Sequence, residues 1–346
     1  AYQLYGDGSN LTGISGGGSG GCLKLVETTN LVSDGFCAGC NITGDGEDNI
    51  LLGCCAGKGI TSGDSNIFMG RYSGDALTTG SNNIGLGWKT GSSLSSGSGN
   101  VFLGQCAGFN NTGNSNVAIG HQASMYRTSG TDNVFLGRYA GNNTTGQTGS
   151  HNIGIGYITL GGTGAHSCNI ALGMSAGQDM TSGCYNIFLG KSSGKEITTG
   201  TENIGLGCCA LGTGILTGQQ NIAIGKKAGT SLTSGGYNIF FGRNAANGAT
   251  TASSNIAMGT GTLGGDTGST ATGADNVIFG SLTAIAATSA ACNVLIGSRA
   301  GRCVTEGEYN IFLGNYAGAQ TTTGDNNVLI GRGVCASSAT ASTEFK

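Results

Sequence analysis

Cysteine is the residue type with the most chemical potential in this 346-residue chain, which contains thirteen cysteines and no proline. Four of them are grouped near the start, as Cys37, Cys40 and the adjacent pair Cys54 and Cys55. Four thiolates suit zinc, but a CxxC followed by an adjacent pair lacks the second CxxC of the usual zinc motifs. We therefore expect no metal centre, with zinc as the minor alternative.

A disulfide framework explains part of the same set more simply. Cys37 and Cys55 occupy equivalent positions of successive sequence repeats, and Cys168 and Cys184 occupy neighbouring positions one repeat apart. If the repeats stack, each pair comes within reach of a disulfide. We therefore predict the bridges Cys37–Cys55 and Cys168–Cys184, which require an oxidising compartment. Free thiols are the alternative for the remaining cysteines.

Histidines and carboxylates show no pattern typical of catalysis. His121, His151 and His166 lie in expected turns without a serine or cysteine elbow, so we interpret them as solvated loop residues. Carboxylates occur singly near turns, whereas a glycosidase needs a cleft that holds a pair of them. The sequence therefore predicts a protein that is not an enzyme, with no catalytic, cofactor-binding or metal-binding residues.

Charge and hydropathy exclude two further classes of partner. Charged residues make up 10% of the chain, the formal net charge is −3, and the fifteen Lys and Arg are scattered. No basic stripe follows a phosphate backbone, so we expect no nucleic acid. No apolar run approaches the roughly 20 residues of a membrane span, so we expect no membrane insertion. The chain opens AYQLYGDGSN, and we interpret it as a processed piece of a soluble protein.

The element that must position these residues is a short sequence repeat. The phrase Asn-[Ile/Val]-x-x-Gly occurs seventeen times, and twelve of the sixteen intervals between its asparagines equal the interval from Asn66 to Asn83. Because the asparagines recur in register, stacked repeats predict a structural ladder of side-chain amides. The asparagines of this ladder are Asn49, Asn66, Asn83, Asn100, Asn116, Asn133, Asn152, Asn169, Asn186, Asn203, Asn221, Asn238, Asn255, Asn276, Asn293, Asn310 and Asn327.

The residues after each asparagine predict a strand. With the asparagine as position 1, positions 2 and 4 are apolar in every copy, which is the period of a β-strand, and Gly follows at position 5. One unit cannot bury its apolar side alone, but units stacked about 4.8 Å apart build a continuous core. The seventeen-residue repeat predicts an all-β fold, a β-solenoid or β-roll of about 17–18 coils and roughly 80 Å. We expect residues 1–30 to form an N-terminal linker or cap, residues 31–335 the solenoid and residues 336–346 a tail.

The residues at position 3 indicate that another chain covers the strand. It is never polar in the seventeen copies, and such a run of apolar residues is typical of a strand covered on both faces. If positions 2 and 4 face the core, position 3 faces another chain, with Phe packing over Gly and Ala across the interface. The predicted interchain seam contains Phe68, Phe102, Phe135, Phe188, Phe240 and Phe312. A second layer of the same coil is the alternative cover for this face.

Several phrases resemble known fibrous proteins. The segments NSNVAIG at 114–120 and QQNIAIGKKAG at 219–229 resemble the head repeats of trimeric autotransporter adhesins of the YadA type. The longer unit NIFMGRYSGDALTTGSNNIGLG at 66–87 is similar to repeats of phage and cyanophage tail-fibre proteins, and YGDGSNLTGI at 5–14 is similar to a segment ahead of such repeats. The resemblance implies a parallel homotrimeric rod used for attachment.

The functional expectation is a structural fibre protein that forms a rigid extracellular or virion-surface rod for attachment to a host or surface. The expected partner is the chain itself, as a homotrimer or homo-polymer. Rows of Thr and Asn repeated along the coils suit weak, repeated contacts with a cell-surface glycan; examples are Thr78-Thr79, Thr198-Thr199 and Thr321 to Thr323. The alternatives are a subunit of an end-to-end extracellular filament and an ice-binding β-solenoid.

Overall fold

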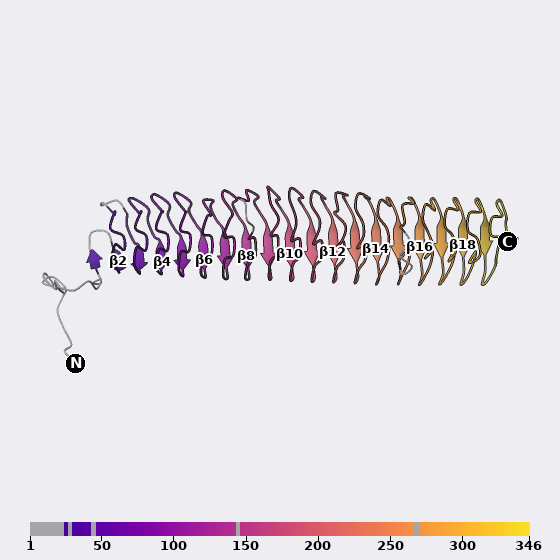
Figure 1. Ribbon diagram of the computed structural model, residues 1–346, viewed down its shortest axis with the longest axis horizontal. Coiled ribbons are helices and arrows are strands. Elements are labelled where there is room, and N and C mark those ends of the chain that lie inside the picture. The colour runs from indigo at the N-terminus through magenta and orange to yellow at the C-terminus, as the bar shows by residue number, and fades with distance from the viewer. Residues whose placement is uncertain (1–23, 27–29, 43–45, 143–145, 266–269) are drawn as a thin grey trace, which may run out of the picture.

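The protein is a straight rod made of one continuous sheet. The computed structural model describes residues 24–26, 30–42, 46–142, 146–265 and 270–346. The strands lie side by side along the rod in chain order (Figure 1). They are β1 (Lys24–Val26), β2 (Leu31–Asp34), β3 (Ile50–Leu52), β4 (Ile67–Met69), β5 (Ile84–Leu86), β6 (Val101–Leu103), β7 (Val117–Ile119), β8 (Val134–Leu136), β9 (Ile153–Ile155), β10 (Ile170–Leu172), β11 (Ile187–Leu189), β12 (Ile204–Leu206), β13 (Ile222–Ile224), β14 (Ile239–Phe241), β15 (Ile256–Met258), β16 (Val277–Phe279), β17 (Val294–Ile296), β18 (Ile311–Leu313) and β19 (Val328–Ile330).

The register of the sheet follows the sequence repeat. From β2 to β19 each strand pairs in parallel with the next, so that Ile67 lies beside Ile84 and Phe68 beside Gly85. The pairing keeps its phase where the repeat lengthens to 21 residues, between β15 and β16, because the extra residues lie outside the strands. The fold is therefore the predicted all-β solenoid, in which each turn of the coil is one copy of the sequence repeat.

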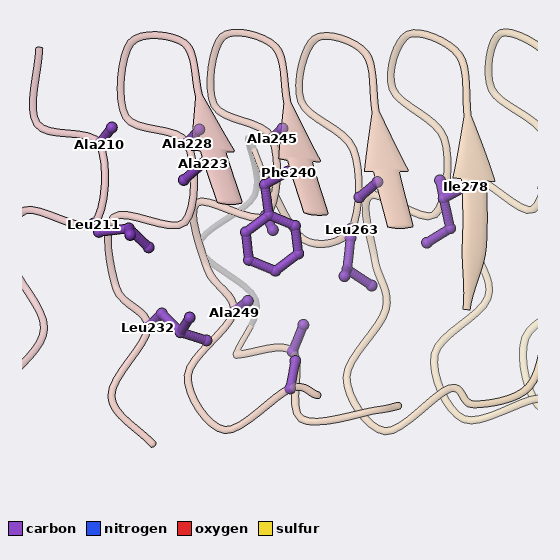
Figure 2. Packing of buried hydrophobic residues seen from close by; sticks show 14 of the residues in the cluster. Ala210, Leu211, Ala223, Ala228, Leu232, Phe240, Ala245, Ala249, Leu263 and Ile278 are labelled. Atoms are coloured by element: carbon purple, nitrogen blue, oxygen red, sulfur yellow. The ribbon is translucent and has the colours of Figure 1, made fainter. Parts of the chain in front are cut away.

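The core lies on the other side of the strand from the one predicted. The position 3 side chains point inward and are fully buried, whereas positions 2 and 4 face outward and are half-exposed or exposed. We call one turn of the coil a rung and name it by its strand. Small residues at position 8 and apolar residues at position 12 complete the interior, as Ala228 and Leu232 do in the rung of β13. In Figure 2 the Phe240 ring points from β14 into this interior, near Ala245. The expectation that positions 2 and 4 form the core is wrong.

The predicted interchain seam is wrong for the same reason. Each of its members is 0% exposed within a single chain, namely Phe68, Phe102, Phe135, Phe188, Phe240 and Phe312. The alternation of Phe with Gly and Ala reflects packing between successive rungs of one chain. A Cβ placed on Gly154 would lie 2.8 Å from Phe135 Cδ1, one rung away. The coil itself covers position 3, so no partner chain can reach these rings.

Glycine recurs because two places in each coil have no room for a side chain. Gly70, at position 5, has a φ of 137°, and a Cβ there would meet the carbonyl oxygen of Gly87 at 2.3 Å. Gly80, at position 15, has no such φ, but a Cβ would lie 2.2 Å from the carbonyl oxygen of Gly97. Close stacking alone requires glycine at Gly80, whereas close stacking and a positive φ both require it at Gly70.

Each strand is short because the chain turns sharply on both sides of it. Residues at positions 7 and 17 adopt the left-handed conformation in nearly every rung, as Asn82 (φ 62°) does before β5 and Lys89 (φ 53°) does after it. Most of these residues are neither Gly nor Asn, so composition gives little warning of the turns. The turns place positions 6 and 7 along one edge of the outer sheet face and positions 16 and 17 along the other.

Both end strands of the parallel stack have a neighbour. The antiparallel strand β1 pairs with β2, with Leu25 opposite Val32. At the other end, residues 344–346 lie beside β19, where the Glu344 carbonyl accepts a hydrogen bond from Val328 N–H at 2.7 Å. Part of the segment expected to be a tail therefore forms one more rung. Residues 1–23 of the expected linker lie outside the described residues.

Candidate interaction surface

The asparagine ladder is present and lies inside the rod. Asn186 shows the pattern: its Nδ2 donates to Asn169 Oδ1 at 3.1 Å and to the Gly200 carbonyl at 2.8 Å. Its Oδ1 in turn accepts from both the backbone N–H and Nδ2 of Asn203, at 2.9 and 3.1 Å. The seventeen side chains are 0 to 1% exposed. The ladder therefore holds rungs together and presents nothing to a ligand.

A second ladder runs along position 16 and was not predicted. Ser98 Oγ accepts from the Ser81 backbone N–H at 3.1 Å, and Ser81 Oγ accepts from Asp64 N–H at 2.9 Å. Asp64 and Asp325 use a carboxylate oxygen in the same way. The sequence signal is a recurrent Ser, Thr, Asn or Asp two residues before the ladder asparagine. A short acceptor there satisfies a backbone donor of the previous rung.

The outer sheet face is apolar along the whole rod. Positions 2 and 4 place two apolar side chains on each of the seventeen strands β3 to β19, and none of these side chains is buried. The most exposed include Ile330 at 52%, Phe241 at 49% and Ile155 at 40%. A fully exposed apolar side chain of this size offers about 100 Å², from ~2.5 kcal/mol at ~25 cal/mol per Å². Partial exposure of two such side chains on each strand therefore leaves on the order of 1,000 Å² of apolar surface along the rod. The largest patch of a typical monomer is roughly 300–600 Å².

The threonine rows are only partly available to a ligand. Thr78, at position 13, donates its hydroxyl to the Ser95 carbonyl at 2.8 Å, and Thr305 donates to the Thr322 carbonyl at 3.3 Å. The next residues along the chain, at position 14, are exposed, as Thr79 and Thr199 are. Thr321 is 1% exposed and belongs to the interior, which corrects its assignment to a surface row. Thr78 is itself exposed, but its hydroxyl is already bonded, so the row of available hydroxyls is one residue wide.

The predicted disulfides are absent, and Cys37, Cys55, Cys168 and Cys184 are free thiols. Cys37 and Cys55 do stack, because Cys55 N–H donates to the Phe36 carbonyl at 2.8 Å. Stacked residues of parallel rungs lie about 4.8 Å apart with parallel side chains, however, and a disulfide needs Cβ atoms within roughly 3.5–4.5 Å. Tyr185 N–H donates to Ser167, so Tyr185 stacks on Cys168 and Cys184 does not.

Burial lowers the reactivity of two of the free thiols. Cys55 Sγ lies 3.6 Å from Cys54 Sγ. Burial is the main cause that raises the pKa of the Cys55 thiol, and it also raises the pKa of Cys106. Across the described residues, no three Cys, His, Asp or Glu side chains are grouped to hold a metal ion, Cys37, Cys40, Cys54 and Cys55 included.

One histidine departs from the expectation of solvated turns. His151 is exposed, but His166 is 0% exposed and occupies position 15, where most rungs have Gly. Neither ring nitrogen of His166 has a hydrogen-bond partner. Burial is the main cause that lowers its pKa to about 3, and the nearby Arg127 charge adds to the shift, so His166 is neutral at neutral pH. It cannot act as a solvent-accessible base.

Arg127 is the other unexpected buried group. It is fully buried, donates to Gln147 Oε1 at 2.6 Å and to the Gly149 carbonyl at 2.7 Å, and stacks 4.8 Å from the Phe135 ring centre. Burial lowers its pKa to about 9. Within the described ranges Arg127 forms no ion pair, so neutral amide oxygens and an aromatic face hold its charge. These contacts are structural.

The surface therefore offers an extended apolar face and a narrow hydroxyl row. In the described part of the chain no helix is long and apolar enough to cross a membrane. Comparison with protein-family models, with curated proteins and with solved structures finds no match to this sequence. Its function must be inferred from the architecture of the rod.

Proposed function

We propose that the protein is a structural fibre component, a rigid rod on the outside of a cell or virion that holds an attachment surface at a distance. Copies of the chain associate side by side, as a homotrimer, through the apolar outer face. The proposal joins the resemblance to tail-fibre and adhesin repeats with the geometry of the solenoid. The activity is mechanical and adhesive.

The observation that carries the proposal is the uninterrupted stack of parallel rungs from β2 to β19. Every rung repeats the same hydrogen bonds, so bending the rod requires many buried bonds to lengthen together. At about 4.8 Å per rung the stack is roughly 80 Å long. This length comes from one chain with a thin interior, which suits a spacer better than a catalytic domain.

The apolar outer face supports association of copies. A stable interface buries roughly 800 Å² of each partner, and the outer face offers on the order of 1,000 Å² of apolar surface. Ile153 and Ile155 on β9, both exposed near the middle of the rod, would be covered in such an assembly. A bare stripe of this size would instead promote aggregation.

Attachment is assigned to the exposed hydroxyl row at position 14. Thr79, Thr199 and Thr323 at position 14 are exposed and belong to the rungs of β4, β11 and β18. Single hydroxyl contacts with a glycan are weak, but repeated contacts on one rigid body add through effective concentration. A cell-surface glycan is the receptor class that suits this row.

Two features favour this function over the alternatives. An end-to-end filament continues the parallel stack from one copy to the next, whereas β1 pairs with β2 in the antiparallel direction and interrupts that stack. Ice binding needs free hydroxyls in ordered pairs, whereas Thr78 and other threonines at position 13 donate their hydroxyls to carbonyls of the next rung. Neither alternative has a specific observation in its favour.

The test combines shape with adhesion. Electron microscopy and light scattering should show stiff rods of three chains with a uniform length of roughly 80 Å. Beads coated with the protein should bind glycan-bearing cells, and the variant Thr79→Glu, Thr199→Glu, Thr323→Glu should bind at least tenfold less. The matched control carries Glu at Lys58, Lys195 and Arg302, which lie at position 10. Flexible particles, or rods that bind no cell and no glycan, would overturn the proposal.

A further inference from the structure

The two edges of the apolar outer face carry opposite charges. Nine of the fifteen Lys and Arg fall at positions 6 and 7 of the seventeen rungs, where there is no Asp or Glu. Six of the eighteen Asp and Glu fall at positions 16 and 17 of the same rungs, Glu47 and Asp48 hold the equivalent places before Asn49, and no Lys or Arg lies at these positions. We call these the basic edge and the acidic edge. Exposed members include Arg138 and Lys191 on the first and Asp132 and Glu202 on the second.

These charges do not neutralise each other within one chain. The ion pairs of the described residues are His151 with Asp132, Lys195 with Glu196 and Lys346 with Glu344, and none of them joins the two edges. The strand of the apolar face separates the edges in every rung. Arg138 instead contacts the Tyr139 ring and hydroxyl on its own edge. Both edges are thus left facing outward beside an uncovered apolar stripe.

From this arrangement we infer that the occupant of the face is a second copy of the chain in parallel orientation, with the basic edge of each copy against the acidic edge of the next. The inference rests on the proposed assembly of copies and adds its interface and direction. Rotation about an axis along the rod brings unlike edges together in every face-to-face contact. Two antiparallel copies that meet face to face are related by a twofold axis that runs across the rod. This rotation keeps each edge on its own side, so like edges meet.

The positions of the charges along the rod agree with this choice. Three strands have charges on both sides, with Asp64 and Arg71 around β4, Asp132 and Arg138 around β8, and Asp325 and Arg332 around β19. Copies at equal height therefore face one another with opposite charges at both ends of the rod and in its first half. In an antiparallel pair the rung of Asp64 would lie opposite the rung of Glu308, so the contact would be repulsive.

Aromatic contacts order the side chains of the basic edge, which favours their pairing with the acidic edge of another copy. His121, Tyr139 and Tyr157 form edge-to-face contacts over three successive rungs, with ring centres 5.5 and 6.0 Å apart. Further along the rod, Arg299 Nη1 donates to Tyr316 Oη at 2.5 Å. A guanidinium held against a neighbouring ring loses less freedom when it pairs with a carboxylate.

Charge reversal tests the interface. Arg138→Glu, Lys191→Glu, Arg243→Glu reverses three of the nine charges of the basic edge and places them against like charges of the next copy, so the concentration for half-assembly, measured by light scattering, should rise at least tenfold. Asp132→Lys, Glu202→Lys, Asp275→Lys added to the same chain reverses three charges of the acidic edge as well and should restore assembly. The matched control is Lys58→Glu, Lys195→Glu, Arg302→Glu, which changes net charge equally away from the face and should leave assembly unchanged. An equal loss in the control, or no loss in the first variant, overturns the inference.

Energy transfer tests the direction. Donor and acceptor fluorescent proteins fused after Lys346 in separate preparations should show strong transfer when mixed, because parallel copies bring the two ends together. An antiparallel pair would hold them roughly 80 Å apart and show little transfer, which would overturn the inference. Single rods that still bind cells would also overturn it while leaving the attachment function intact. Assemblies that match these predictions but bind no cell or glycan would overturn only the attachment function.

Discussion

Phe68 fills the space that Gly85 leaves open one rung further along the rod. A Cβ placed on Gly85 would lie 2.5 Å from Phe68 Cδ1, and both residues are buried in the same chain. The ring and the missing side chain are therefore one packing unit. This relationship gives position 3 to the interior and leaves positions 2 and 4 for contact with other molecules.

The Phe68 and Gly85 pair should show compensation. Gly85→Ala alone should lower the free energy of unfolding by about 1–3 kcal/mol, because the added methyl overpacks the ring. Phe68→Leu alone should also destabilise the protein by leaving a void. The double variant should be more stable than the sum of the two losses predicts, as measured by denaturant unfolding. Strict additivity would show that the two side chains do not compete for one space.

The asparagine ladder should be sensitive at any single rung. Asn186→Ala removes the acceptor of Asn203 N–H and the donor to the Gly200 carbonyl. Leaving buried polar groups unpaired costs about 1–3 kcal/mol each, so a loss of about 3 kcal/mol or more in stability is expected. The exposed Thr199→Ala is the control and should change stability by less than about 0.5 kcal/mol. A loss no larger than the control's would contradict a cohesive role for the ladder.

His166 should make stability depend on pH below neutrality. Its pKa is lowered to about 3 by burial and by Arg127, whereas in the unfolded chain it is about 6.5. Between these values the unfolded state binds the proton and the folded state does not, so stability is full above pH 6.5 and falls as the pH drops toward 3. His166→Gly should remove this part of the pH dependence.

The matched control for His166 is His151→Gly, at an exposed residue that already has a φ of 60°. It should leave the slope of stability against pH between 4 and 6 close to that of the unaltered protein. Denaturant midpoints measured across this range give both slopes. If His166→Gly and the unaltered protein show the same slope, the buried neutral imidazole is ruled out.

The thiols should react at different rates in the folded rod. Cys303 is exposed and should be alkylated first, whereas Cys55 and Cys106 are buried and have raised pKa values, so few of them are thiolates at neutral pH. Timed alkylation with peptide mapping measures the order. A non-reducing map that contained a linked Cys37–Cys55 peptide would contradict the free thiols of the structure.

The repeat itself was enough to predict the architecture of the rod. The spacing of Asn66, Asn83 and Asn100 predicts equal coils, and apolar residues at positions 2 and 4 predict the strand that follows each asparagine. Stacked coils then require the amide ladder, because a buried amide needs partners in the rungs above and below. These conclusions depend only on period and on the need to satisfy buried polar groups.

Only the tertiary structure decided which side of the strand faces inward. Ile67, Phe68 and Met69 are all apolar, so hydrophobicity gives no preference, and a change of one residue exchanges the two faces. The turns after Gly70 and Gly74 decide it by folding the chain back over the Phe68 side, where a Cβ on Gly74 would lie 2.5 Å from the ring. The same turns place the charged edges beside the outer face, and they exclude the Cys168–Cys184 bridge because its residues occupy different places in the coil.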